Sequence, residues 1–422
     1  MLKNKKTSVI LLLCLFLMTG CGQSVTEDND MQKESSQESA VTAEATEEPV
    51  QTATPLTEEE QIHYEMLERS VMSTGNNERM QKVMEKAKNG EDVTLAYIGG
   101  SITQGYNAGT TEIFAKLSAD YFRSTYGTTG KVNYVNAGLS GTPSLLGLIR
   151  SDRDIFEAKP DVVFIEFAVN DGQDMMNKSA FESLVRKALT QEQEPAVVLL
   201  FSMTETGYTC QNTMQLIGMN YELPMISVPN ALNPELEAGR MSWADWADDG
   251  SHPNKEGQKL YSEFIIHYFN KVAAEESFGA YQLPEKMMNL DYTTMKMADK
   301  ESVKVLEPGS FHEESGHESF SKGWIKPADA VENDALIFEI DCRSLFFVYK
   351  EANNASYGTA EVYVDGEKVY TISSNQKEGW NNPVPVRIYR GTECKKIKVE
   401  VRMQEGDEDK IFCLLAIGYC VE

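Results

Sequence analysis

The sequence predicts an α/β domain with a parallel sheet, followed by a second domain built as a β-sandwich. Three observations lead to this prediction. The chain has 422 residues, which is too long for one ordinary hydrophobic core. From Val93 to Ala274, short apolar strands alternate with amphipathic helices, as in a parallel sheet that helices cover on both faces. After about residue 285 the helical periodicity ends, and short strands separated by turn signals follow.

The first twenty residues have the features of a bacterial lipoprotein signal. A short basic start precedes an apolar run from Val9 to Met18, which is too short to span a bilayer. The run ends in Met18-Thr19-Gly20-Cys21, where small residues directly before a cysteine resemble a lipobox. We therefore expect residues 1–20 to be a signal peptide and Cys21 to be lipidated, which anchors the protein extracytoplasmically to the cell membrane. An ordinary secretion signal with a chance cysteine is the alternative.

The acidic composition excludes one class of function and marks one segment. The formal net charge is −26, which argues against a nucleic-acid partner because such a partner needs a basic face. Residues 21–56 are rich in Glu, Asp, Ser, Thr, Gln and Ala and nearly lack aromatic residues. This segment cannot bury enough apolar surface to fold, so we expect a disordered acidic tether.

The α/β domain is expected over residues 57–283. It begins with a helical stretch from Glu58 to Lys88 that breaks near Gly75-Asn76-Asn77. Further helices are predicted over 113–126 and 179–189, and the helix from Lys255 to Ala274 closes the domain. The predicted buried strands are the apolar segments 93–98, 132–137, 161–168, 196–201 and 224–228.

The β-sandwich is expected over residues 284–422. Asp365-Gly366 stands between two alternating segments and predicts a tight hairpin. Cys342, Cys394 and Cys413 lie in apolar or strand-like surroundings, so we expect three small buried side chains. The predicted strands are 335–340, 344–349, 359–364, 368–373, 384–390 and 396–402.

A glycine-rich turn directly follows the first strand of the α/β domain. Gly99-Gly100-Ser101-Ile102-Thr103 permits a sharp turn that exposes a serine beside the start of a helix. Alone this is weak evidence, because such a turn can also hold a phosphate or place a serine at a helix N-cap. The Gly-x-Gly-x-x-Gly and Walker patterns of phosphate loops are absent from the turn.

Three further polar segments accompany this turn. Asn136-Ala137-Gly138 follows the second strand, Val169-Asn170-Asp171 follows the third, and Asp248-Asp249-Gly250-Ser251-His252 precedes the last helix. In this order, a Ser, a Gly, an Asn and an Asp-x-x-His resemble the four blocks of SGNH (GDSL-type) hydrolases. The resemblance covers roughly residues 75–275 and implies a three-layer, flavodoxin-like sheet. It also implies a serine esterase that uses no metal or organic cofactor.

The resemblance gives each of these residues a role. Ser101 is expected to attack an ester carbonyl, and His252 to accept its proton and return it to the leaving alcohol. Asp249 has the Asp-x-x-His spacing, which its neighbour Asp248 lacks, and is expected to orient the imidazole. The expected oxyanion hole combines the backbone N–H groups of Ser101 and Gly138 with the side-chain amide of Asn170.

The sequence departs from the family's pattern beside the nucleophile. Most relatives carry Asp where this chain has Gly100, and Gly commonly stands where it has Ala168. Gly100 is not expected to take part in the chemistry, but it argues against close similarity to lipase-like members. Taken singly, Asn170 and Gly138 are more often turn residues.

The substrate is predicted from location and architecture. Trp243 and Trp246 precede the Asp-His loop and either bind substrate or pack the loop. The second domain loosely resembles the jelly-roll modules of carbohydrate acetyl esterases. We therefore expect an O-acetyl ester on a polysaccharide as the substrate; the alternatives are an acyltransferase acting on a surface glycan and a non-catalytic glycan-binding lipoprotein. Aromatic residues of the sandwich form either its core or a sugar platform, and the candidates are Trp324, Tyr349, Tyr357 and Trp380.

Overall fold

The computed structural model describes residues 56–421, apart from residues 315 and 331. The predicted signal peptide, the lipidation site Cys21 and the predicted tether up to residue 55 lie outside the described residues. In the part of the chain that is described, no helix has the length and apolar character needed to cross a membrane.

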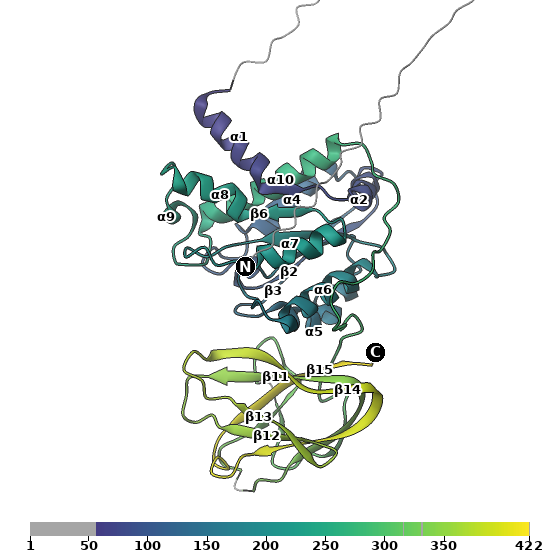
Figure 1. Ribbon diagram of the computed structural model, residues 1–422, viewed down its shortest axis with the longest axis vertical. Coiled ribbons are helices and arrows are strands. Elements are labelled where there is room, and N and C mark those ends of the chain that lie inside the picture. The colour runs from purple at the N-terminus through teal and green to yellow at the C-terminus, as the bar shows by residue number, and fades with distance from the viewer. Residues whose placement is uncertain (1–55, 315, 331, 422) are drawn as a thin grey trace, which may run out of the picture. The chain divides into compact units, whose positions relative to one another are not determined.

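The first half of the described chain forms the predicted α/β domain around a six-stranded sheet (Figure 1). Five strands are parallel in the order β6-β5-β4-β2-β3, which is the flavodoxin-like order, and the short β1 (Val71–Ser73) joins the edge antiparallel to β6. The fold prediction is therefore confirmed. The parallel strands are β2 (Val93–Gly99), β3 (Val132–Gly138), β4 (Val162–Glu166), β5 (Ala196–Phe201) and β6 (Met225–Ser227).

Helices cover both faces of the sheet, which explains why its central strands are apolar throughout. In β2, Leu95 and Tyr97 belong to one buried cluster, whereas Ala96 and Ile98 belong to the other. The first cluster lies under α1 (Glu58–Ser70), α2 (Glu78–Lys88), α4 (Phe114–Tyr126), α8 (Val228–Glu237) and α10 (Lys255–Ala274). The second lies under α5 (Ser144–Asp154), α6 (Met175–Leu189) and α7 (Gln211–Asn220).

The second half forms an antiparallel β-domain, as predicted, from one nine-stranded sheet that bends around its own core. The two longest strands are β11 (Leu336–Ala352) and β14 (Trp380–Met403), and each was predicted as two strands. Their pairing shifts register between Cys342 and Ser344, so the alternation of buried and exposed side chains breaks there. The remaining strands are β7 (Lys296–Ala298), β8 (Lys304–Glu307), β9 (His312–Glu314), β10 (Gly323–Lys326), β12 (Thr359–Val364), β13 (Glu367–Ser373) and β15 (Phe412–Cys420).

Two local predictions in the β-domain have opposite outcomes. Asp365 and Gly366 have φ values of 51° and 84°, as the predicted two-residue hairpin between β12 and β13 requires. Cys342 and Cys413 are buried, but Cys394 is exposed, so the prediction of a buried side chain was wrong there. Cys394 lies in β14, where two exposed lysines follow it and the strand faces solvent.

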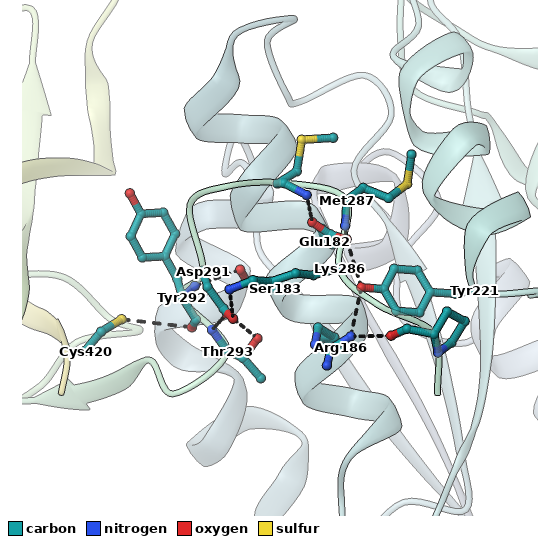
Figure 2. Close-up of polar contacts among 12 residues, drawn as sticks. Glu182, Ser183, Arg186, Tyr221, Lys286, Met287, Asp291, Tyr292, Thr293 and Cys420 are labelled. Carbon is teal, nitrogen blue, oxygen red and sulfur yellow. Dashed lines mark hydrogen bonds and ion pairs between the residues drawn. The ribbon is translucent and has the colours of Figure 1, made fainter. Parts of the chain in front are cut away.

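The segment that joins the two domains is bonded tightly to α6, as Figure 2 shows. The buried Glu182 carboxylate accepts hydrogen bonds from the backbone N–H groups of Met287 (2.6 Å) and Met288 (2.7 Å) and from the Tyr221 hydroxyl (2.8 Å). The next residue of α6 also takes part, because Ser183 Oγ accepts the backbone N–H of Tyr292 at 2.9 Å. These bonds fix the path of the chain into the β-domain.

The two domains also share apolar contacts beyond this segment. The cluster under α5 and α6 continues into Phe346, Val348 and Ala416 of the β-domain. The rings of Tyr292 and Phe346 meet edge to face, with centroids 5.2 Å apart. The β-domain therefore packs directly on the α5 side of the α/β domain.

Candidate active site

Ser101 begins the short helix α3 (Ser101–Gln104) immediately after β2, at the carboxyl edge of the parallel sheet. The turn before it has no room for side chains. A Cβ atom on Gly99 would lie 2.2 Å from Thr103 Oγ1, and one on Gly100 would lie 2.1 Å from Asn170 Oδ1. In this chain a side chain at position 100 would therefore collide with the Asn170 amide.

His252 and Asp249 reach the serine from the loop before α10. His252 Nε2 lies 2.9 Å from Ser101 Oγ, and His252 Nδ1 lies 2.8 Å from Asp249 Oδ2. Because the carboxylate can only accept, the Nδ1 proton faces Asp249, and Nε2 is left to accept the serine proton. A serine hydroxyl bonded in this way can be deprotonated as it attacks an electrophile.

Hydrogen bonds hold Asp249 in its charged form. Its Oδ1 accepts the backbone N–H groups of Ser251 and His252, both at 2.8 Å, and Asn107 Nδ2 lies 3.2 Å from Oδ2. Partial burial would raise the pKa of Asp249, but hydrogen bonds from His252 and Ser251 outweigh it and lower the pKa to about 2. The carboxylate that orients His252 is therefore ionised at any pH near neutrality.

Asn170 follows β4 and lines the same cavity as Ser101. Its Oδ1 is buried without a hydrogen-bond partner among the described residues, beside the backbone of Gly100. The other end of the amide carries the two N–H donors. No group in the described part of the chain accepts a hydrogen bond from the backbone N–H of Ser101. The Asn170 side-chain amide and the Ser101 backbone N–H therefore both remain available as donors beside the serine hydroxyl.

Gly138 lies at the same edge but differs from the prediction in its hydrogen bonding. A Cβ atom here would lie 2.1 Å from the backbone nitrogen of Gln104, so only glycine lets α3 approach β3 so closely. The Gly138 N–H, however, donates to Asn136 Oδ1 at 2.8 Å, and Asn136 Nδ2 donates to the Thr103 carbonyl at 2.8 Å. The predicted third oxyanion donor is thus occupied within the protein.

The serine and histidine open into a cavity of about 360 Å³ that both domains line. Trp380, at the start of β14, lines this cavity and is 54% exposed. A Cβ atom on Gly141 would lie 2.5 Å from Trp380 Cζ2, so the indole rests on this glycine. The cavity is lined by Ser101, Tyr106, Ser140, Gly141, Val169, Asn170, Ser251, His252 and Trp380.

Two further cavities adjoin this one and share lining residues with it. One of about 350 Å³ shares Tyr106, Ser140 and Trp380 with it, and one of about 290 Å³ shares Gly141 and Asn170. Together they form a groove that is open to solvent along the contact between the domains. Such a groove has space for several linked rings rather than for one acyl group.

The aromatic residues predicted to bind substrate lie elsewhere. Trp246 is 1% exposed and packs near Tyr261, with ring centroids 5.9 Å apart, so its predicted contact with substrate is wrong. Trp243 Nε1 donates to the Asp249 carbonyl at 2.7 Å and fixes the Asp-His loop instead of lining the cavity. In the β-domain Trp324 and Tyr349 are buried and Tyr357 is half-buried, which leaves Trp380 as the exposed member of the predicted platform.

Two neighbours of the histidine were not predicted. The Tyr106 ring lies 4.6 Å from the His252 ring and is 52% exposed at the mouth of the cavity. Asn107, next to it, has φ of 68° and bonds Asp249 across the loop. A Tyr-Asn pair after a glycine is no recognisable sequence motif, so the sequence could not indicate that the fold places the pair next to His252.

The chain is similar to a known protein family in sequence and to a two-domain esterase in structure. Residues 97–260 match the model of the GDSL-like Lipase/Acylhydrolase family. Thioesterase 1/protease 1/lysophospholipase L1 of Escherichia coli (strain K12) is 22% identical over 192 residues, which cover 44% of this chain and 86% of the relative.

Two solved structures are similar over both domains. A two-domain esterase (CEX) active on acetylated mannans has a TM-score of 0.77 and 27% identity, over 84% of this chain and 98% of that one. The same esterase co-crystallized with mannopentaose has a TM-score of 0.75, with the same identity and coverage.

Proposed function

We propose that the chain is a serine esterase of the SGNH (GDSL-type) hydrolase kind, with an additional C-terminal β-domain, and that it removes O-acetyl groups from a polysaccharide. One observation carries the proposal. The hydrogen-bonded series Ser101, His252 and Asp249 ends in a cavity that the exposed indole of Trp380, from the β-domain, also lines.

In the proposed acylation step, Ser101 Oγ bonds to the acetyl carbonyl carbon while His252 Nε2 takes the hydroxyl proton. The tetrahedral intermediate then breaks its bond to the sugar oxygen. That oxygen leaves with the proton held by His252, so an alcohol departs and an acetyl group stays on Ser101. Asp249 stays ionised and stabilises the imidazolium between the two proton transfers.

The second step repeats the first with water. His252 takes a proton from the water as its oxygen bonds to the acetyl carbon. The ester bond to Ser101 then breaks, the serine recovers its proton, and acetic acid is released and ionises. Binding and proton transfer account for both steps, so we assign no role to a metal or organic cofactor.

We propose that the negative oxygen of the intermediate is stabilised by the Ser101 N–H and the Asn170 side-chain amide. Each such donor typically contributes about 2.7–4 kcal/mol to the transition state. The hydrogen bond from the Gly138 N–H to Asn136 argues against Gly138 as a third donor.

A polysaccharide is favoured over a lipid or a small ester by the shape of the site. Two further cavities adjoin the one that contains the serine, and aromatic faces pack well against the apolar faces of sugar rings. The similar two-domain esterase is described as active on acetylated mannans, which supports an acetylated mannan as the first substrate to test. The lipid anchor at Cys21, which we also propose, would hold the enzyme where such polymers occur outside the cell.

The test is acetate release from acetylated mannan and acetylated xylan by the wild-type enzyme and by Ser101→Ala. We expect release by the wild type and a loss of about 10⁶-fold in the variant. Equal rates in both proteins would overturn the proposal. Transfer of acetyl to an added oligosaccharide, in preference to water, would identify an acyltransferase instead. Failure of an organophosphonate to label Ser101 would favour a non-catalytic glycan-binding protein.

A further inference from the structure

A buried guanidinium lies behind the serine turn. Arg150, on α5, is 1% exposed, and its Nη2 donates to the Gly99 carbonyl oxygen at 3.2 Å. Its Nη1 donates to Asp154 Oδ2 at 2.7 Å, which balances the charge. The forked side chain thus links the backbone two residues before Ser101 to a carboxylate one turn further along α5.

This arrangement is costly for stability alone. Removing a guanidinium from water carries a large desolvation cost, and apolar side chains of similar size often serve a core equally well. The Arg150 Nε–H, moreover, is buried without an acceptor among the described residues. A purely structural role therefore leaves the burial of this charge unexplained.

The carbonyl that Arg150 binds belongs to the peptide group between Gly99 and Gly100. The same carbonyl accepts the Leu139 N–H at 3.0 Å. The N–H at the opposite end of this peptide group faces the buried Glu166 and stabilises its charged form. Thr103, within α3, also donates to Glu166 Oε2, at 3.2 Å. One peptide group thus lies between a buried cation and a buried acid.

A Gly-Gly segment has little conformational preference of its own, so its orientation depends on outside contacts. The backbone dihedral angles of Gly100, φ −89° and ψ −148°, are the last ones that precede Ser101 along the chain. A rotation of the preceding peptide group would turn both Ser101 Oγ and the Ser101 N–H. Stabilisation of an oxyanion needs its donors within a few tenths of an ångström of their productive positions.

We propose that Arg150 is a positioning residue for the reaction, whose fork ties the Gly99 carbonyl to Asp154 and thereby holds the Ser101 N–H and hydroxyl in their productive directions. This inference rests on the proposed serine esterase function and deepens it. Arg150 touches no substrate and acts only through the turn. Its loss impairs the chemical step while substrate binding along the groove is unchanged.

The test compares Arg150→Met with Arg153→Met. Arg153 lies on the same helix and also bonds Asp154, at 2.5 Å, but it is partly exposed and reaches the Ser319 carbonyl rather than Gly99. With 4-nitrophenyl acetate and acetylated manno-oligosaccharides, we expect kcat to fall about 10- to 100-fold in Arg150→Met with KM within twofold. Arg153→Met should keep the kcat of the wild type. Unfolding temperatures of both variants show whether they remain folded.

Two further measurements distinguish a positioning role of Arg150 in the reaction from a role in the stability of the fold alone. Millimolar guanidinium should restore part of the kcat of Arg150→Ala, and with saturation, because it fills the vacated site; a general loss of stability is not rescued in this way. Arg150→Lys, which keeps the charge but cannot reach Gly99 and Asp154 together, should have an intermediate kcat. It also serves as the test if the Met and Ala variants do not fold.

Several outcomes would overturn the inference. A folded Arg150→Met or Arg150→Lys enzyme with the kcat of the wild type would do so, as would equal losses in Arg150→Met and Arg153→Met. If the wild type hydrolyses 4-nitrophenyl acetate but no acetylated glycan, the proposed substrate fails and Arg150 is still tested on the small ester. If the wild type hydrolyses no ester and no organophosphonate labels Ser101, both proposals fail.

Discussion

Trp380 of the β-domain rests on Gly141 of the α/β domain, at the rim of the cavity that contains Ser101. The contact is so close that a single methyl group on Gly141 would lie 2.5 Å from the indole. Gly141 itself has φ of 66°, a left-handed conformation that disfavours any side chain. Backbone conformation and packing thus act together to hold the exposed indole beside the serine.

Removing this indole should affect polymers more than small esters. In Trp380→Ala we expect kcat/KM on acetylated mannan to fall about fivefold or more, because an aromatic contact contributes about 1 kcal/mol beyond simple burial. The rate with 4-nitrophenyl acetate should stay within twofold, since Ser101, His252 and Asp249 are untouched. Trp380→Phe, which keeps an aromatic face, is the matched control. Equal losses on both substrates would show that Trp380 only supports the fold.

The same selectivity should follow from loosening the connection between the domains. Glu182→Ala removes the acceptor for two backbone N–H groups and the Tyr221 hydroxyl, as can be followed in Figure 2. We expect the free energy of unfolding to fall by about 3 kcal/mol, because buried donors lose their partner. Activity on acetylated mannan should fall more than activity on 4-nitrophenyl acetate. The control Glu157→Ala, at an exposed position, should change neither the free energy of unfolding nor the activity on either substrate. Denaturant unfolding and the rates with acetylated mannan and 4-nitrophenyl acetate are the measurements.

The sequence predicted which residues belong to the site better than it predicted their contacts and hydrogen bonds. Ser101, Asn170 and His252 follow strands or precede a helix, and a parallel sheet brings such loops to one edge. Trp380 was one of four aromatic candidates, but its place in the cavity of Ser101 could not be predicted, because that place depends on how the β-domain packs against α5. The engagement of the Gly138 N–H could not be predicted either, since it depends on the conformation of the Asn136 side chain.

Fold prediction succeeded where hydrophobic patterns are continuous. The core strands β2 and β5 are apolar from end to end and were predicted almost to the residue. The strands β11 and β14 were divided because a register shift and a run of exposed lysines interrupt the alternation. The short β1 has too few residues to show any period.

The buried acid behind the serine turn should make stability depend on pH. Burial raises the pKa of Glu166 to about 7, above its ordinary value of 4.5. Between these two values the folded chain holds a proton that the unfolded chain releases, so stability falls as the pH rises from about 4.5 to 7 and then levels off. Asp171, whose pKa burial also raises to about 7, adds a dependence of the same sign.

Glu166→Gln should remove part of this dependence. The neutral amide does not ionise, so the variant should gain unfolding temperature relative to the wild type at pH 8 and gain nothing at pH 4.5. Thermal unfolding followed by circular dichroism across this range is the measurement. A difference between variant and wild type that is independent of pH would mean that Glu166 is ionised throughout, or equally solvated in both states.

The contact between Gly100 and Asn170 predicts a non-additive pair of mutations. Asn170→Ala removes one oxyanion donor and should lower kcat by about 10²- to 10³-fold. Gly100→Ala places a methyl group where the Asn170 amide lies and should cause a similar loss by displacing it. Gly279→Ala, which introduces a methyl group into open space, should leave kcat unchanged.

The double variant decides between two explanations of Gly100. If its only task is to leave room for the Asn170 amide, Gly100→Ala adds no further loss once Asn170 is alanine, and the double variant has the kcat of Asn170→Ala alone. Such a result gives a coupling energy close to the whole effect of one mutation, as expected for residues in contact. If the two losses multiply instead, Gly100 acts separately, through the backbone conformation that delivers Ser101. Single-turnover rates with 4-nitrophenyl acetate, which isolate acylation from product release, are the appropriate measurement.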